Sequence, residues 1–220
     1  MKHTMKSQVI RTAILFLMFV LFTILVARFD VRPVGPEGSE VGFASVNHFV
    51  FQRIGVHLVW YKITDWLGIA AVLCALGFAL LGLYQLLMRK SIRKVDSRIL
   101  VLGGFYALVI ACYLFFETVV INCRPVILGT EPEASYPSSH TMLVVCIMAT
   151  AAIQVRALCP NKKGLCRAAD FLAVSLSTIT VIGRLLSGVH WLTDIAGALL
   201  LSAALVELYR TVLNLLLGRQ

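Results

Sequence analysis

Charged residues are scarce in this chain. Asp, Glu, Lys and Arg make up 14% of its 220 residues, whereas hydrophobic residues make up 59%. An ordinary soluble domain has about 25% charged and about 45–50% apolar residues. So little polar material could not cover a water-soluble globule, and so much apolar material excludes a disordered chain. The composition therefore predicts an integral membrane protein, with a length that allows about six spans.

Acidic residues are the fewest, with 11 against 20 Lys and Arg, and the formal net charge is +9. Such an excess could indicate nucleic-acid binding, but fourteen of the basic residues lie in four places. These are the N-terminus (Lys2, Lys6, Arg11), residues 89–98, residues 156–167, and Arg210 with Arg219. They alternate with less basic segments, as the positive-inside rule expects of cytoplasmic loops. We predict a membrane-anchoring face, cytoplasmic termini and no nucleic-acid partner.

The cysteines do not indicate a disulfide framework or a metal site. Three of the six lie inside apolar runs, where cysteine behaves as a small hydrophobe. Cys159 and Cys166 lie in a predicted cytoplasmic loop, where reducing conditions disfavour a disulfide. With no other Cys or His nearby, this pair is a poor zinc signal. We predict no structural disulfide and no metal.

Six apolar runs are candidates for membrane spans, each of which needs about 20 residues. They cover about residues 9–27, 65–88, 99–121, 138–155, 168–182 and 191–213. The first has a basic flank but no small-residue cleavage site, so it is predicted to be a retained anchor and not a signal peptide. We therefore predict an all-α, six-helix membrane bundle that forms a single domain over residues 1–220.

The first external connection contains a further predicted helix, at about residues 46–60. Its apolar residues recur at helical spacing, at Val46, Phe49, Val50, Ile54 and Leu58, opposite Asn47, His48, Gln52, Arg53 and His57. This pattern is typical of an amphipathic helix in the outer membrane interface. The alternative is a helix that only packs on the bundle.

Polar residues gather at one end of the predicted bundle. Burying ionisable groups in a membrane is costly, so such residues are the first candidates for function. With both termini inside, all of them face the external leaflet, and they predict one site. They are Glu117, Arg124, Ser138, Ser139, His140, Arg184, His190 and Asp194.

These residue types suit phosphoryl chemistry without a metal. His190 and Asp194 are four apart, so on a helix they share a face, and the carboxylate can orient the imidazole as a nucleophile or base. The helix that begins at about Ser138 offers backbone N–H groups to an anion. Arg124 and Arg184 present planar forks that match phosphate oxygens.

Each group alone also has a structural explanation. The His190–Asp194 pair could cap a helix, the arginines could be interfacial anchors, and Ser138 could be an ordinary N-cap. The arrangement as a whole favours a functional site.

Three short motifs carry a resemblance to a known family. They are Arg124-Pro125, then Pro137-Ser138-Ser139-His140, then Arg184 with His190 and Asp194. In order and spacing they resemble the signature motifs of the type 2 phosphatidate phosphatase superfamily. That superfamily includes membrane lipid phosphatases and soluble vanadium haloperoxidases.

The resemblance implies a mechanism for this chain. His190 would attack phosphorus to form a phosphohistidine while Asp194 orients its ring. His140 would protonate the leaving oxygen and then activate water. The phosphate would be held by Arg124, Arg184, Ser138 and Ser139. No cofactor and no obligate protein partner are implied.

The chain departs from the family pattern at three positions. Glu117 stands where members usually have Lys, Ser139 where they have Gly, and Gly183 where they have Ser. Only Glu117 reverses the charge at a position that would contact phosphate. Two unit charges about 4 Å apart interact by about 1 kcal/mol in water and by about 4 kcal/mol at an effective dielectric of 20. We predict that Glu117 pairs with an arginine or contacts a hydroxyl or amine of the substrate head group. Glu131 and Glu133, in the outer loop that follows, add negative charge that is consistent with a cationic partner. Alternatively, those two loop carboxylates are only solvated.

The resemblance and the topology lead to a membrane lipid phosphatase that acts at the outer leaflet, in a bacterial plasma membrane. Undecaprenyl diphosphate is the first expected substrate, and phosphatidate or phosphatidylglycerophosphate the second. The alternatives are a lipid phosphotransferase and a non-catalytic lipid-binding relative.

Overall fold

The computed structural model describes residues 2–218, with side chains from residue 5, and all the long elements in this range are helices. Two short 3₁₀ turns, Pro36–Gly38 and Ile92–Lys94, lie between helices, and two isolated β-bridges are the only extended pairings within this range. This confirms the predicted all-α class. The helices are α1 (Lys2–Arg28), α2 (Ala44–Ile54), α3 (Leu58–Arg89), α4 (Ser97–Thr118), α5 (Ser139–Leu158), α6 (Lys163–Leu186) and α7 (Leu192–Leu217).

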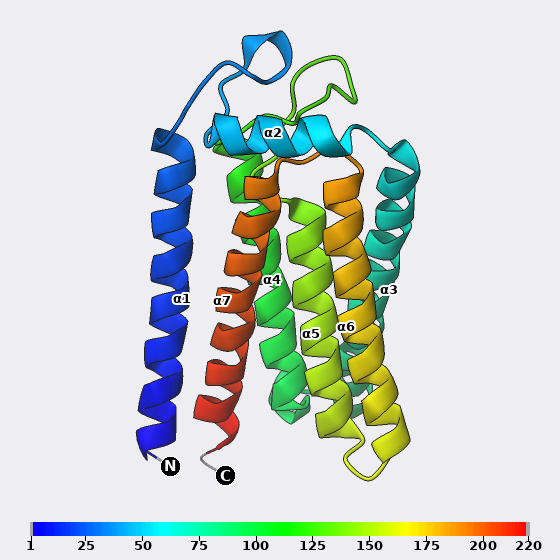
Figure 1. Ribbon diagram of the computed structural model, residues 1–220. Helices are drawn as coiled ribbons and strands as arrows, with labels where there is room; N and C mark the ends of the chain where they lie inside the picture. Colours follow the sequence, from blue (N-terminus) through cyan, green and yellow to red (C-terminus); the bar gives the residue numbers. More distant parts are fainter. Residues whose placement is uncertain (1, 219–220) are drawn as a thin grey trace.

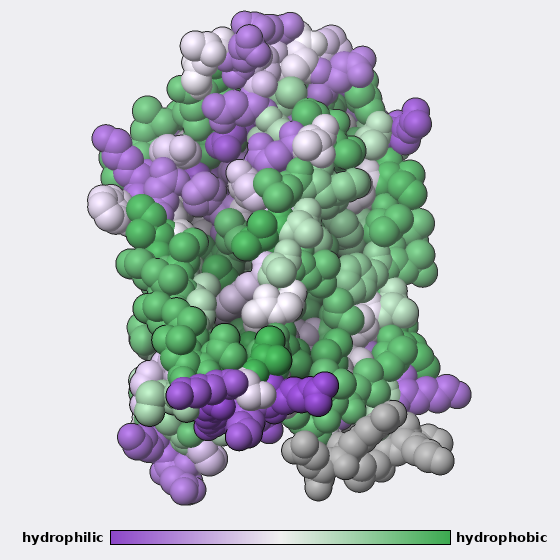
Figure 2. All heavy atoms as spheres, turned by 180° about the vertical axis from the view of Figure 1, so that it is seen from behind, coloured by the Kyte–Doolittle hydropathy of each residue, from purple (hydrophilic) through white to green (hydrophobic). Residues whose placement is uncertain are grey.

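Six of these helices, all except α2, are long and apolar enough to cross a membrane. They stand side by side, and α2 lies across one end of the bundle (Figure 1). On the face that Figure 2 shows, hydrophobic side chains form a broad band across the middle, between hydrophilic groups at the two ends. The chain is therefore an integral membrane protein with the predicted six-helix architecture.

Both chain ends and the α5–α6 connection lie at the end of the bundle opposite α2 (Figure 1). The basic segments at residues 89–98 and 156–167 follow α3 and α5, which both run toward that end. The clustering of basic connections at one end agrees with the charge pattern of the sequence. Arg219, one of the predicted basic residues, lies outside the described residues.

Helices α5 and α7 form the centre of the bundle, and the others pack around them. α1 runs beside α7, and the hydroxyls of Thr12 on α1 and Thr211 on α7 lie 3.1 Å apart. Farther along α1, the hydroxyl of Thr23 lies 2.8 Å from that of Tyr136, in the loop before α5. Gly197 on α7 makes room for Tyr136, because a Cβ there would lie 2.5 Å from the ring.

The predicted boundary between the interfacial helix and the second span is wrong. The helix ends at Ile54 and not near residue 60, because Gly55 has φ 74°, a conformation that glycine adopts without strain. α3 then begins at Leu58, so Leu58 and Asp65 belong to the same long helix. The fifth span is also longer than predicted, since α6 covers Lys163–Leu186.

The faces of α2 also differ from the amphipathic prediction. Asn47, predicted on the polar face, is 1% exposed, whereas the apolar Val46 and Phe49 are 48% and 57% exposed. Asn47 Nδ2 donates to the carbonyl of Gly42 and to the hydroxyl of Thr193, and its Oδ1 accepts from the N–H of Thr193. A buried polar side chain needs such partners, so Asn47 directs this face of α2 onto the start of α7.

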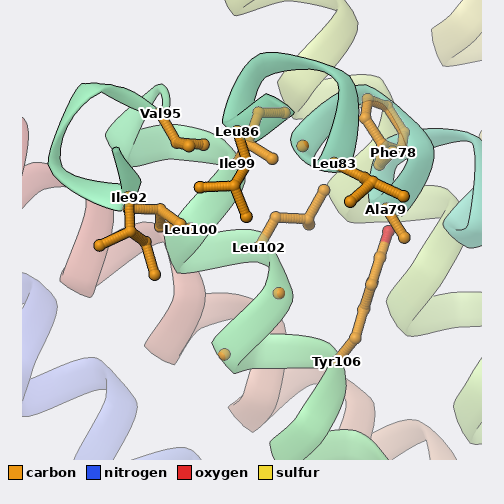
Figure 3. A pocket seen from close by; sticks show the side chains of 13 residues that line it. Phe78, Ala79, Leu83, Leu86, Ile92, Val95, Ile99, Leu100, Leu102 and Tyr106 are labelled. Atoms are coloured by element: carbon orange, nitrogen blue, oxygen red, sulfur yellow. The ribbon is translucent and has the colours of Figure 1, made fainter. Parts of the chain in front are cut away.

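Two apolar grooves open beside α3. One, of about 730 Å³, lies between α3 and α4 at the end of the bundle away from α2, and its wall is formed by aliphatic side chains such as Leu83, Ile92 and Ile99 (Figure 3). The other, of about 870 Å³, lies between α3 and α5 and ends at Tyr61, Asp65 and His140. Only the second groove reaches the predicted site.

Candidate active site

The second and third motifs meet at the starts of two neighbouring helices. The N–H of Ser138, the N-cap residue of α5, donates a 3.1 Å hydrogen bond to the carbonyl of Asp194 in the first turn of α7. Ser187–Trp191 connects α6 to α7 beneath α2 (Figure 1). Gly188 has φ 69°, and a Cβ there would lie 2.3 Å from the carbonyl oxygen of Gly55. The connection therefore lies directly against the end of α2.

His190 and Asp194 lie close together, but not for the reason that the sequence suggested. α7 begins at Leu192, so His190 lies in the preceding connection and not on the same helix face. Asp194 instead reaches back to the helix start, where its Oδ2 accepts from the N–H of Trp191 at 2.9 Å. The same oxygen lies 3.6 Å from His190 Nδ1, which is near but longer than a hydrogen bond.

His190 is buried and surrounded by charges of both signs. Burial lowers the pKa of His190 below its ordinary value; Asp194 opposes this shift, and the positive charges of Arg124 and Arg184 add to it. The net direction is downward, so the imidazole is neutral at pH 7. A neutral ring with Nδ1 toward Asp194 leaves Nε2 as the basic, nucleophilic nitrogen.

Arg184 is fully buried, and its charge is balanced by a residue outside the three motifs. Its Nη2 donates to Oδ1 of Asp65 on α3, and its guanidinium carbon lies 4.9 Å from the ring centre of Tyr61. Asp65 Oδ1 also lies 3.2 Å from Nε2 of His140. One carboxylate oxygen thus contacts both a predicted phosphate-binding residue and a predicted acid–base residue.

Arg124 is positioned by the loop between α4 and α5. Its N–H donates to the carbonyl of Glu133, and Cys123 forms an isolated bridge with Ala134, so the loop folds back on itself. Arg124 Nε lies 3.0 Å from Glu133 Oε2, without the alignment of a hydrogen bond. The positive charge of Arg124 contributes to the lowered pKa of His190, so the loop brings Arg124 into the cluster.

The two serines of the second motif lie differently. Ser138 is buried, and its hydroxyl donates to the hydroxyl of Thr141 at 3.0 Å. Its side chain and its N–H are therefore both engaged within the protein. Ser139 instead lines a small cavity together with Glu117 and His190. Of the two serines, Ser139 has the better position to contact a ligand.

Glu117 makes no ion pair with either arginine. Arg124 pairs with Glu133 and Arg184 pairs with Asp65, whereas Glu117 is exposed at the rim of the cavity that it shares with His190. The predicted pairing of Glu117 with an arginine is therefore wrong, because other carboxylates take both partners. Its predicted contact with a substrate head group stays a prediction.

The cluster contains several buried nitrogens that have no hydrogen-bond partner in the described residues. They are Nε and Nη1 of both Arg124 and Arg184, Nδ1 of His140, and both ring nitrogens of His190. Buried polar groups are normally paired, so converging unpaired donors indicate a site for an anion. Among residues 2–218, no group of three or more His, Cys, Asp and Glu side chains is placed to hold a metal ion.

The sequence analysis missed two residues of this site, Asp65 and Asn122. Asp65 gave a usable signal, because it is an isolated carboxylate at the outer end of an apolar run, which is costly without a partner. Asn122 gave none. It is buried two residues before Arg124, and its Nδ2 donates to Asp194 Oδ1 at 3.3 Å.

Comparison with known proteins agrees with this geometry. The family model of the PAP2 superfamily matches residues 111–215, which contain all three motifs. The fold is similar to the crystal structure of the first transmembrane PAP2 type phosphatidylglycerolphosphate phosphatase from Bacillus subtilis, with a TM-score of 0.59 and 18% identity over 90% of this chain and 94% of that chain. No curated protein matches the chain. Residues 111–215 therefore resemble the PAP2 superfamily, the type 2 phosphatidate phosphatases, and the whole fold is similar to a member of that superfamily.

Proposed function

We propose that this protein is a membrane lipid phosphatase that works through a phosphohistidine on His190. The observation that carries the proposal is the convergence of His190, His140, Arg124 and Arg184 with unpaired nitrogens at one buried place. Phosphoryl transfer needs mainly positioning and stabilisation of charge on the equatorial oxygens. The fully buried guanidinium of Arg184 and the largely buried one of Arg124, beside a neutral imidazole, provide both.

In the first step, Nε2 of His190 attacks phosphorus, the N–P bond forms and the P–O bond to the lipid breaks. Protonated His140 gives its proton to the leaving oxygen, while Asp194 orients the His190 ring and stabilises its positive charge. In the second step, His140 takes a proton from water as the water oxygen attacks phosphorus. The N–P bond then breaks and inorganic phosphate leaves. Arg124 and Arg184 hold the phosphoryl group throughout, and Ser139 with the free N–H groups of the first turn of α5 supports it.

The groove between α3 and α5 supports a lipid substrate. Its apolar wall includes Ile69, Val72 and Leu73, which are between 49% and 60% exposed and would face the bilayer core. The groove ends at Asp65 and His140, so a tail in the groove would leave its phosphate beside the site. Substrate would enter sideways from the membrane.

The basic connections, at the end away from the site, favour a cytoplasmic location for that end by the positive-inside rule. The site would then face the external side of a plasma membrane, as in a bacterium, and no metal, cofactor or obligate protein partner is needed for the chemistry proposed. Undecaprenyl diphosphate suits such an external site. Phosphatidylglycerophosphate is the second candidate, favoured by the name of the similar structure.

Phosphate release by purified protein in detergent tests the proposal. The assay would use undecaprenyl diphosphate, phosphatidate and phosphatidylglycerophosphate, each with EDTA present. We expect release that EDTA does not reduce and that His190→Ala abolishes. His48→Ala is the matched control, because His48 is a half-buried histidine of α2 whose side chain bonds Gln52, away from the three motifs. Loss of release with EDTA, or full activity of His190→Ala, would contradict the mechanism. Phosphate transfer to an added lipid or sugar without release would indicate a phosphotransferase.

A further inference from the structure

Asp65 lies between two residues of the proposed active site, although none of the three motifs contains it. Its Oδ1 accepts a hydrogen bond from Arg184 Nη2 and lies 3.2 Å from His140 Nε2. One carboxylate oxygen therefore contacts two groups of the site. They are the guanidinium of Arg184, which would hold phosphate, and the imidazole of His140, which would transfer the proton.

Two glycines allow α3 to come close enough for this contact. A Cβ on Gly183, the residue before Arg184, would lie 2.6 Å from Cγ2 of Thr64, the residue before Asp65. A Cβ on Gly68 would lie 3.2 Å from Cδ2 of His140. Any side chain at position 183 would therefore meet Thr64, so the glycine fits the close approach of α3 to α6.

Balancing the buried charge of Arg184 explains only half of the arrangement. A fully buried guanidinium needs a counter-charge, and any carboxylate near Arg184 would provide it. That role does not require contact with His140. The contact does determine how the imidazole is used, because a carboxylate at Nε2 favours the Nε2–H tautomer and leaves Nδ1 free. His140 Nδ1 is indeed buried and has no partner among the described residues.

We propose that Asp65 is the positioning residue of His140: it holds Nε2–H, so that Nδ1 gives the proton to the leaving oxygen and later takes one from water. The inference rests on the proposed function. The charged and titratable groups around His140 are Asp65 and Tyr61 on α3, Arg184 on α6, His190 before α7, and Arg124 after α4. Asp65 is the anion that touches the ring. Bound phosphate would partly neutralise the charge of Arg184. Asp65 would then stabilise mainly the His140 imidazolium, so phosphate binding would favour the protonated form of His140 that acts as the acid.

The dependence on the leaving group tests this role. An alkyl phosphate needs a proton on its leaving oxygen, whereas a p-nitrophenyl phosphate leaves well without one. We expect Asp65→Asn to lower kcat/KM for a short-chain alkyl phosphate by at least about tenfold, and for the p-nitrophenyl ester by less than about threefold. His140→Gln should show the same selectivity. kcat/KM is the right quantity because it does not include hydrolysis of the phosphoenzyme.

Asp170→Asn is the matched control. Asp170 accepts from Arg156 Nε at 2.9 Å between α5 and α6, at the opposite end of the bundle, so the same substitution breaks an interhelical pair away from the site. It should leave both substrates unaffected. Equal losses for the two substrates in Asp65→Asn would show a role in phosphate binding or folding only, and no loss would show no role. Either result overturns the proposal. Partial recovery of the alkyl rate in Asp65→Glu would support it.

A second measurement does not depend on turnover, and so separates this inference from the proposed function. The chain has five histidines, and His140→Gln assigns the ¹⁵N signals of His140 in labelled protein. We expect His140 to carry its proton on Nε2 in the native protein and to lose that preference in Asp65→Asn. A protein that releases no phosphate but shows this change would refute the phosphatase and retain the Asp65–His140 contact. The Nδ1–H tautomer in native protein would overturn the positioning role.

Discussion

The N–H of Ser138 donates directly to the carbonyl of Asp194, 3.1 Å away, and so ties the start of α5 to the start of α7. These residues are 56 positions apart in the chain. The bond fixes the second motif against the third without using any side chain. Both side chains are then free for other contacts: Ser138 bonds Thr141, and Asp194 bonds Asn122 and the N–H of Trp191.

The first prediction concerns pH. Burial holds the pKa of His190 below its ordinary value of 6.5. The nucleophile therefore stays mostly neutral as the pH falls to 6.5, and protonation removes it only at lower pH. The acid limb of kcat/KM should therefore have its midpoint below 6.5. Asp194 opposes the shift, so Asp194→Asn should move the limb to still lower pH while it lowers the rate. The pH profiles of kcat/KM for the native protein and Asp194→Asn are measured with the same substrate. The ionisation of the substrate then affects both profiles equally and cancels in the comparison. A limb that moves to higher pH in Asp194→Asn would contradict this.

The second prediction concerns the close approach of α3 and α6. Gly183→Ala should destabilise the protein by about 1–3 kcal/mol, as overpacking does, because the new Cβ meets Thr64 Cγ2. Thr64→Ser removes that methyl group and should restore part of the loss in the double variant. Gly103→Ala is the control, because no atom lies within 4 Å of its Cβ position. Thermal unfolding in detergent compares the native protein, the two single variants, the double variant and the control, and additive effects in the double variant would contradict the clash.

The third prediction concerns Asn47. Asn47→Ala leaves the N–H and hydroxyl of Thr193 without their partner, and should lower stability by about 1–3 kcal/mol. Gln52→Ala, on the same helix, breaks only the exposed contact with His48 and should lie within about 0.5 kcal/mol of the native protein. Equal unfolding temperatures for the two variants would show that α2 is not held by Asn47.

The fourth prediction concerns the unusual charge of Glu117. Glu117→Lys restores the charge usual in the superfamily, at the rim of the cavity that contains Ser139 and His190. It should lower KM for a simple lipid phosphate about fivefold to tenfold, since reversing one charge at this range is worth a few kcal/mol before screening. Glu131→Lys, in the outer loop between α4 and α5, makes the same charge change and should have less than about a twofold effect. Unchanged KM and unchanged substrate preference in Glu117→Lys would exclude a selective role.

Much of the architecture could be predicted from the sequence, because long apolar runs and basic loops report directly on the membrane. The helix ends could not. Nothing in the hydropathy of residues 46–60 marks the break at Gly55, which depends on a positive φ and on the fit of the end of α2 against Gly188.

The motif residues could be named, but their contacts could not. His190 and Asp194 meet through a helix cap and not through a shared helix face. The partners of the arginines come from outside the motifs, at Asp65 and Glu133, because only the packing of α3 and the folded outer loop bring them there.

The proposed mechanism depends on a covalent phosphohistidine on His190, which can be trapped. Purified protein would be mixed with a ³²P-labelled lipid phosphate, quenched within milliseconds in alkali, and digested to locate the label. We expect an acid-labile, alkali-stable label on His190 that is absent in His190→Ala and long-lived in His140→Gln, in which activation of water is lost. Phosphate release with no trapped label, or a label that persists in His190→Ala, would contradict it.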